Sequence, residues 1–290
     1  MKFVGFAGAS GARLGVVERD RVVDLQTVDP RIPSDLGELL ARENGDLTGI
    51  GERARSAPAA ARIPLADLRF ALPVARPGKI ICLGLNYIEH VKEGTNKVPD
   101  FPTIFIRCRT SLAPHLSALL RPLVSEQFDY EAELVAIIGR RGKHIKLADA
   151  LSYVAGYSCF NEGSVRNFQR RTTQWDIGKN FDHTGGFGPW MVTADELPPG
   201  GKGLRIQSRI NGQVLQDDNT RNMMFPVAET IADVSQAMTL EPGDILVTGT
   251  PSGVGYPRTP PKWMKEGDTV EVEIEGVGTL RNSVENEKPS

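Results

Sequence analysis

Short β-prone runs separated by glycine and proline fill most of the chain after about residue 77. They cover residues 80–85, 103–107, 134–139, 204–210, 245–248 and 270–274. One helix is predicted where Pro226 precedes Val227, Ile231, Val234 and Met238 at helical spacing. Because β-helix-β units do not repeat, we expect a mixed, β-rich roll or sandwich with a few peripheral helices rather than a doubly wound sheet.

The first part of the chain combines predicted strands with a predicted helix. Residues 14–17 and 21–25 read as strands joined by a tight turn at Arg19 and Asp20, and a helix is expected around residues 36–43. The segment from Pro73 to Pro77 then leads into the longer part. We therefore predict a small N-terminal α+β domain over residues 1–76 and a larger catalytic domain over residues 77–290.

Composition narrows the class of protein. The 290 residues are 40% hydrophobic and carry a net charge of -2, as in an ordinary globular protein. This balance predicts neither a nucleic-acid partner nor an anionic membrane partner, since both are usually bound by a basic face. No apolar run is long enough to cross a bilayer, and residues 1–10 lack the pattern of a signal peptide. A cytoplasmic protein is expected.

The cysteines and histidines are dispersed. Three cysteines without C-x-x-C spacing and four histidines without an H-x-x-x-H pair suggest neither a disulfide framework nor a zinc site. If a metal binds, its ligands are expected to be oxygens.

Acidic residues enter one β-prone run at alternating positions. In F-D-Y-E-A-E-L-V-A-I-I, residues 128–138, Glu131 and Glu133 would project to the same side of a strand and could bind one hard cation. Asp129 has the same parity, and three crowded carboxylates would repel one another without a cation. The same pattern would also fit a solvated acidic face, so on these residues alone both interpretations stay open.

A candidate base lies in residues 84–94, G-L-N-Y-I-E-H-V-K-E-G. His90 and Glu93 would be neighbours on a helix, and a carboxylate beside an imidazole suits the activation of water. An exposed surface helix would look similar. The glycines at both ends and the polar residues 95–100 predict a mobile lid.

Three further segments carry candidate chemistry. In N-E-G-S-V-R-N-F-Q, residues 161–169, Glu162 precedes a predicted helix with Ser164 near its start, and Arg166 and Gln169 could face one ligand. Lys179 follows a glycine in G-K-N-F-D-H, and Thr250 lies in a loop of small residues that could hold an anionic oxygen. Each also fits an ordinary surface or turn. Three aromatic residues are expected to pack in the core rather than line a pocket: Trp175, Phe181 and Phe187.

Taken in order, these segments resemble the fumarylacetoacetate hydrolase family over roughly residues 79–284. The resemblance rests on G-L-N-Y with His90 and Glu93, D-Y-E-A-E-L, N-E-G-S-V-R-N-F-Q, G-K, and G-D-I-L-V-T-G-T-P-S-G-V-G. It implies a mixed β-sandwich roll, usually dimeric, that binds Mg²⁺ or Mn²⁺ and acts on small 2-oxo or 2,4-dioxo acids.

The resemblance also implies residue roles. The metal ligands fall on Glu131, Glu133 and Glu162, and the lid dyad falls on His90 and Glu93. Residues that line the substrate cavity fall on Arg166, Gln169, Lys179 and Thr250, with Lys179 adding positive charge near a developing oxyanion. Two positions depart from the pattern: Glu162 stands where aspartate is common, and Arg107 stands where a lysine often follows the strand. We expect Arg107 to bind a substrate carboxylate.

These roles predict a metal-dependent hydrolase that cleaves a carbon-carbon bond in acylpyruvate-like 2,4-dioxo acids, such as fumarylpyruvate, through an enolate. A decarboxylase of oxaloacetate-type 2-oxo acids or a hydroxymuconate-type isomerase could use the same scaffold. A non-catalytic protein that binds a metal or metabolite would follow if Glu162 disables the site.

Overall fold

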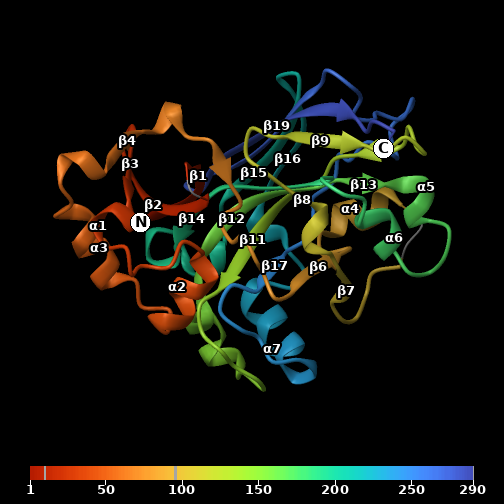
Figure 1. Ribbon diagram of the computed structural model, residues 1–290. Helices are drawn as coiled ribbons and strands as arrows, with labels where there is room; N and C mark the ends of the chain where they lie inside the picture. The colour runs from red at the N-terminus through yellow and green to blue at the C-terminus, as the bar shows by residue number, and fades with distance from the viewer. Residues whose placement is uncertain (10, 95–96, 290) are drawn as a thin grey trace.

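One large sheet forms the centre of the protein in the computed structural model, which describes residues 1–9, 11–94 and 97–289 (Figure 1). Its strands run in the order β4 (Arg62–Pro64), β3 (Arg21–Asp24), β2 (Gly11–Glu18), β1 (Lys2–Gly8), β14 (Gly185–Thr193), β12 (Val154–Glu162), β11 (Ala132–Ile138), β17 (Ile245–Val247), β6 (Ile80–Gly84) and β7 (Thr103–Ile106). Two short strands pair with interior strands outside this order, β5 (Phe70–Ala71) with β1 and β8 (Leu112–Pro114) with β14.

A second sheet packs against the first. Its strands are β16 (Gln213–Asn219), β15 (Arg205–Ile210), β18 (Thr269–Ile274), β19 (Gly278–Asn286) and β9 (Ala118–Arg121), while β10 (Phe128–Asp129) pairs only with β13 (Ser164–Val165). Leu134 of β11 shares a buried core with Ile206 and Val272 of the second sheet. The expected β-rich fold with few helices is confirmed.

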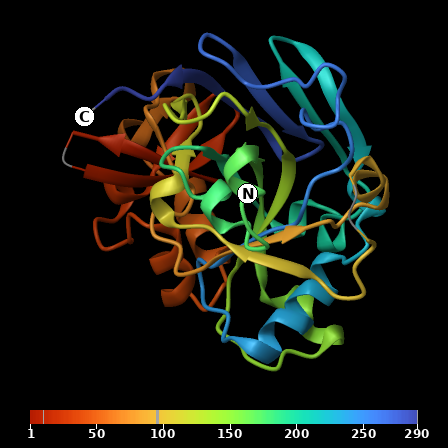
Figure 2. The same ribbon diagram turned by 90° about the vertical axis from the view of Figure 1, so that its right-hand side faces the viewer.

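Helices occupy the periphery, as Figure 2 shows from the side. They are α1 (Leu25–Val28), α2 (Leu36–Arg42), α3 (Thr48–Arg55), α4 (Ile88–Glu93), α5 (Arg166–Gln169), α6 (Asp176–Lys179) and α7 (Val227–Ala237). Val227, Ile231 and Val234 of the predicted stripe are buried in α7, and Met238 follows its last residue and is partly buried. Ser164 lies in β13 and not in the helix expected there. Within the described ranges, no helix is long and apolar enough to cross a membrane.

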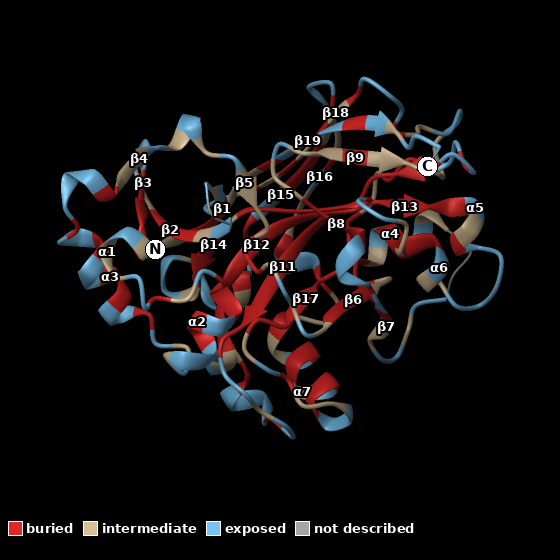
Figure 3. Ribbon diagram, viewed as in Figure 1, coloured by how far each residue is buried: buried red, intermediate tan, exposed pale blue. Residues whose placement is uncertain are grey.

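The N-terminal strands extend the main sheet. Phe3 of β1 pairs with Met191 of β14, and both side chains lie in the core cluster that contains Phe160 of β12. The sheet therefore contains strands from both sides of residue 76, and the division into two domains stays a prediction. Strand β11 lies at the centre of this sheet and is buried along its whole length (Figure 3).

His115 gives the fold a pH dependence. Its Nδ1 accepts a hydrogen bond from the backbone N–H of Arg281 at 3.0 Å, and its ring meets Phe70 edge-on at 4.6 Å. Burial and the charge of Arg281 lower its pKa from 6.5 to about 4. The folded state therefore binds fewer protons than the unfolded state between these values, and stability falls as pH decreases through this range.

Because of His115, we expect the free energy of unfolding to be about 1 to 2 kcal/mol lower at pH 5 than at pH 7. This figure allows for the partial exposure of the ring. Urea unfolding of wild type and His115→Gln at both values measures the difference. An equal pH response in the two proteins would contradict the assignment.

Candidate active site

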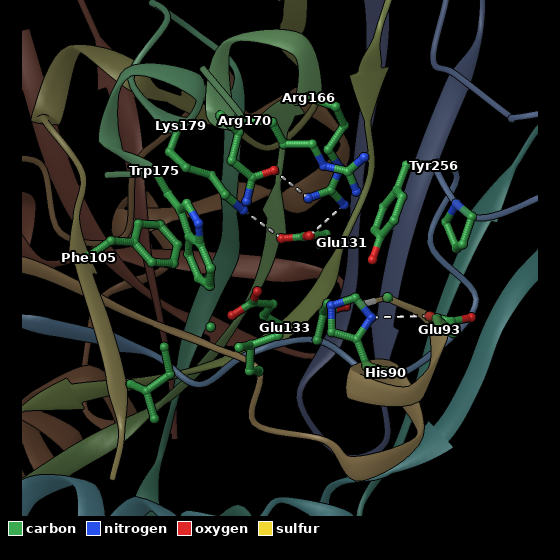
Figure 4. A pocket seen from close by; sticks show the side chains of 17 residues that line it. His90, Glu93, Phe105, Glu131, Glu133, Arg166, Arg170, Trp175, Lys179 and Tyr256 are labelled. Atoms are coloured by element: carbon green, nitrogen blue, oxygen red, sulfur yellow. Dashed lines mark hydrogen bonds and ion pairs between the residues drawn. The ribbon is translucent and has the colours of Figure 1, made fainter. Parts of the chain in front are cut away.

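A cavity of about 500 Å³ opens where β11 begins (Figure 4). The side chains that line it come from α4, β6, β7, α5, α6 and the loop at residues 250–257. Eight of the predicted site residues are among them: His90, Glu93, Glu131, Glu133, Arg166, Gln169, Lys179 and Thr250. The structure therefore brings together segments that are up to 160 residues apart in the chain.

Of the three predicted ligands, Glu133 lies in β11, Glu162 ends the neighbouring β12, and Glu131 directly precedes β11. Ala132 pairs with Asn161 in the antiparallel register of β11 and β12, so Glu131 lies opposite Glu162, whose N–H donates to the Glu131 carbonyl at 2.9 Å. Residues opposite each other, or two apart on one strand, share a face of the sheet. This register explains why Glu131, Glu133 and Glu162 are close neighbours.

Each carboxylate on the cavity wall has a protein donor. Glu131 accepts from Arg166 at 2.6 Å and from Lys179 at 2.8 Å. Burial raises the pKa of Glu131, but the charges of Lys179 and Arg166 outweigh burial and hold the pKa below its ordinary value. Glu133 accepts from the N–H of Gly249 at 2.5 Å, and its pKa is well above the ordinary value because of burial and the charges of Glu162 and Glu131.

Glu162 and Arg107 are not among the described residues that line the cavity, but Oε1 of Glu162 lies 3.8 Å from the ammonium of Lys179, which does line it. The side chains of Glu162 and Arg107 are fully buried and form an ion pair through Oε1 of Glu162. The other Arg107 donors bind Ser111 at 3.0 Å and Thr184 at 2.9 Å. Arg107 is thus placed to hold Glu162 and not, as expected from the sequence, to face a substrate carboxylate. The reason is that the end of β7 turns its side chain inward.

The residues fit a divalent cation by their chemistry. Oε2 of Glu162 is buried and lacks a hydrogen-bond partner among the described residues. Three buried glutamates repel one another, as the raised pKa of Glu133 shows, and an added cation would remove this cost. As placed, no three acidic or histidine side chains in the described ranges converge on one point, because each carboxylate on the cavity wall turns to a protein donor. Oxygen-only donors favour Mg²⁺ or Mn²⁺.

His90 and Glu93 form the predicted pair on α4. Nδ1 of His90 lies 3.1 Å from Oε2 of Glu93, and Oε1 of Glu93 accepts from the N–H of Gly253 at 2.7 Å. Gly253 has a φ of +100°, a conformation that favours glycine. The glycine loop therefore fixes Glu93, and Glu93 orients the imidazole. Residues 95 and 96 of the predicted lid lie outside the described residues.

Arg166 is the centre of a buried network. Its guanidinium donates to Asp129 at 2.8 Å, to Glu131 at 2.6 Å and to Gln169 at 2.9 Å. Asp129 also accepts from the N–H groups of Gly255 and Tyr256, at 2.7 and 3.0 Å. Asp129 thus ties the glycine loop to Arg166 and is not a third acid beside Glu131 and Glu133.

Lys179 and Thr250 are both on the cavity wall. The Lys179 ammonium is buried, contacts Glu131, and lies 5.0 Å from the centre of the Phe105 ring. Thr250 accepts from Nε2 of Gln216 at 2.7 Å, so its own hydroxyl hydrogen is free to point elsewhere. Both side chains can therefore face a bound molecule.

Lining residues that the sequence analysis did not single out include Phe105, Arg170 and Tyr256. Trp175, expected to pack in the core, is partly buried against the core and also lines the cavity beside Gly84, where an added Cβ would lie 2.1 Å from the indole ring. Arg170 follows Arg166 by four residues, which was the one available signal for a shared face. Phe187 is buried in the core, as expected, and Phe181 is partly buried against a second core cluster.

The fold and site define a β-rich protein whose cavity is lined by a histidine-glutamate pair and by buried carboxylates paired with an arginine and a lysine. Residues 79–285 match the fumarylacetoacetate (FAA) hydrolase C-terminal family. The chain belongs to this family.

Relatives extend the comparison to nearly the whole chain. The chain is 42% identical to the mitochondrial oxaloacetate tautomerase Fahd2a of Rattus norvegicus over 264 residues, which covers 91% of this chain and 83% of the relative. Fumarylacetoacetate hydrolase from Exiguobacterium antarcticum is 32% identical with a TM-score of 0.85, over 99% of this chain and all of that structure. Maleylpyruvate hydrolase from Sphingobium sp. SYK-6, solved with manganese(II) and pyruvate, is 31% identical with a TM-score of 0.82 at the same coverage. The predicted family and its link to oxo acids are confirmed.

Proposed function

We propose that this protein is a divalent-metal-dependent enzyme that enolises 2-oxo acids, with oxaloacetate as the first substrate to test. One observation carries the proposal: the His90 and Glu93 pair faces the same cavity as Glu131, Glu133 and Lys179. The similarity to an oxaloacetate tautomerase supports this choice of reaction.

Glu131, Glu133 and Glu162 would hold Mg²⁺ or Mn²⁺. The cation would supply positive charge beside the 1-carboxylate and 2-oxo oxygens of a substrate. The pyruvate and manganese(II) in the structure of the maleylpyruvate hydrolase support this pairing.

His90 would act as the base. When Nδ1–H donates to Glu93, Nε2 is left as the acceptor and can take a proton from C3 of the substrate. The electrons of the C3–H bond form the C2=C3 double bond, and the carbonyl π electrons move onto the C2 oxygen. Lys179 can donate a hydrogen bond to this oxygen, and the proton on His90 can return to either atom. Keto and enol forms then interconvert without loss of atoms.

The second candidate is hydrolysis of acylpyruvates, the reaction expected from the sequence. The same His90 and Glu93 pair favours it, because an oriented imidazole can also activate water for attack on a second carbonyl. The similarity to maleylpyruvate hydrolase supports this reaction. Decarboxylation would need only the positive charge beside the C2 oxygen, which stabilises the enolate, and would not need His90 as a base.

A substrate panel tests the proposal. We expect the Mn²⁺-loaded protein to enolise oxaloacetate, and expect a chelator to abolish this activity and Mn²⁺ to restore it. Fumarylpyruvate and acetylpyruvate test hydrolysis, and release of carbon dioxide from oxaloacetate tests decarboxylation. Turnover of none of these substrates, despite metal binding, would contradict the proposal and favour a binding protein. The cytoplasmic location and the homodimer stay predictions.

A further inference from the structure

Arg166 begins α5, and Arg170 is the residue that follows its last turn. Arg166 and Arg170 are four residues apart, and the Arg170 N–H donates to the Arg166 carbonyl at 3.1 Å. Their guanidinium carbons lie 4.8 and 4.2 Å from the centre of the Tyr256 ring. Figure 4 shows the Tyr256 ring beside these guanidinium groups at the cavity wall. Both cations are therefore presented to the same space.

The two arginines differ in their partners. Arg166 is buried and paired with Asp129 and Glu131. Arg170 is exposed, and no carboxylate of the described residues lies within 4.0 Å of its guanidinium. Arg166 carries the same charge, so the two guanidinium groups repel each other. Arg170 thus offers hydrogen-bond donors that the described chain leaves unused.

The charges on the wall point to the ligand. Arg166 and Lys179 are each paired with a carboxylate of the protein, whereas Arg170 has no such partner among the described residues. The 1-carboxylate of a 2-oxo acid would lie beside the proposed cation. A second carboxylate on the substrate would then supply the partner that Arg170 lacks.

We infer that Arg170, backed by Tyr256, binds a second carboxylate of the substrate, so that the protein selects 2-oxo dicarboxylic acids. This inference rests on the proposed function. Stacking on Tyr256 holds the planar guanidinium in place while its N–H edge stays free, and that edge can bind a carboxylate through two parallel hydrogen bonds. Arg170 is then a residue that sets specificity and not one that moves protons.

Oxaloacetate and 2-oxobutyrate form a matched pair of probes, because a carboxylate in the first replaces a methyl group in the second. Their dissociation constants from the Mn²⁺-loaded protein can be followed by tryptophan fluorescence, since Trp175 lines the cavity. We expect wild type to bind oxaloacetate about 10- to 100-fold more tightly than 2-oxobutyrate. Arg170→Gln should abolish this preference and change the affinity for 2-oxobutyrate by less than about twofold.

Arg171→Gln is the control, because Arg171 stacks on Phe168 and does not line the cavity. It should retain the preference. A preference that survives Arg170→Gln, or is missing in wild type, would overturn the inference, as would equal weakening of both probes. If wild type shows the preference but does not enolise oxaloacetate, the proposed function fails while the role of Arg170 stands.

Discussion

Replacement of His90 by alanine should lower kcat for the enolisation of oxaloacetate by about 100- to 10,000-fold. His90 is the one histidine on the described cavity wall, and its Nδ1 lies 3.1 Å from Glu93. Binding of Mn²⁺ should change little, because His90 is not among the proposed ligands. Steady-state rates and a manganese titration of the same preparation measure the two effects separately.

His144→Asn is the control for a lost imidazole, since His144 is exposed in a turn with a φ of +52° that asparagine tolerates. It should retain full activity. Glu93→Gln keeps the acceptor for Gly253 but can donate to Nδ1, so it favours the tautomer with hydrogen on Nε2. A loss of about 100-fold in kcat is expected. Full activity of His90→Ala would show that another group moves the proton.

Replacement of Arg166 by methionine should lower the free energy of unfolding by about 3 to 5 kcal/mol. The change leaves the fully buried Asp129 without its cation and leaves Glu131, which is 4% exposed, with Lys179 as its one cationic partner among the described residues. Chemical denaturation, with the dependence of the free energy of unfolding on denaturant concentration fitted for each variant, measures the loss. Activity should also fall, because Arg166 lines the cavity.

Arg205→Met provides the comparison. Arg205 pairs with Asp217 at 2.5 Å, but both side chains are about half exposed, so we expect a cost below about 1 kcal/mol. Addition of Asp129→Asn to Arg166→Met removes one of the stranded charges and should recover part of the stability. An equal cost for Arg166→Met and Arg205→Met would contradict the account of the buried network.

Local patterns were enough to predict much of the fold. The alternation of apolar and acidic residues before β11 and the helical stripe of α7 each report on the burial of their own side chains, and both elements formed as expected. The pairing of β1 with β14 was not predictable, because nothing in residues 2–8 specifies a partner that lies more than 180 residues away.

The candidate site divides in the same way. His90, Glu131 and Lys179 line one cavity. They could be singled out from the sequence because each lies in a motif whose residue types suit the same chemistry. Tyr256 and Trp175 could not be assigned, since their positions depend on how loops fold over the sheet. Arg107 was predicted to bind a substrate carboxylate, but in the structure it pairs with Glu162 of the protein itself.

The most direct test of the central claim is an anomalous diffraction map of crystals soaked with Mn²⁺ and oxalate. We expect one manganese peak in the cavity, bounded by carboxylate oxygens of Glu131, Glu133 and Glu162, and its loss in Glu133→Gln. A map without a peak among these three side chains, from crystals that are saturated with Mn²⁺, would contradict the account.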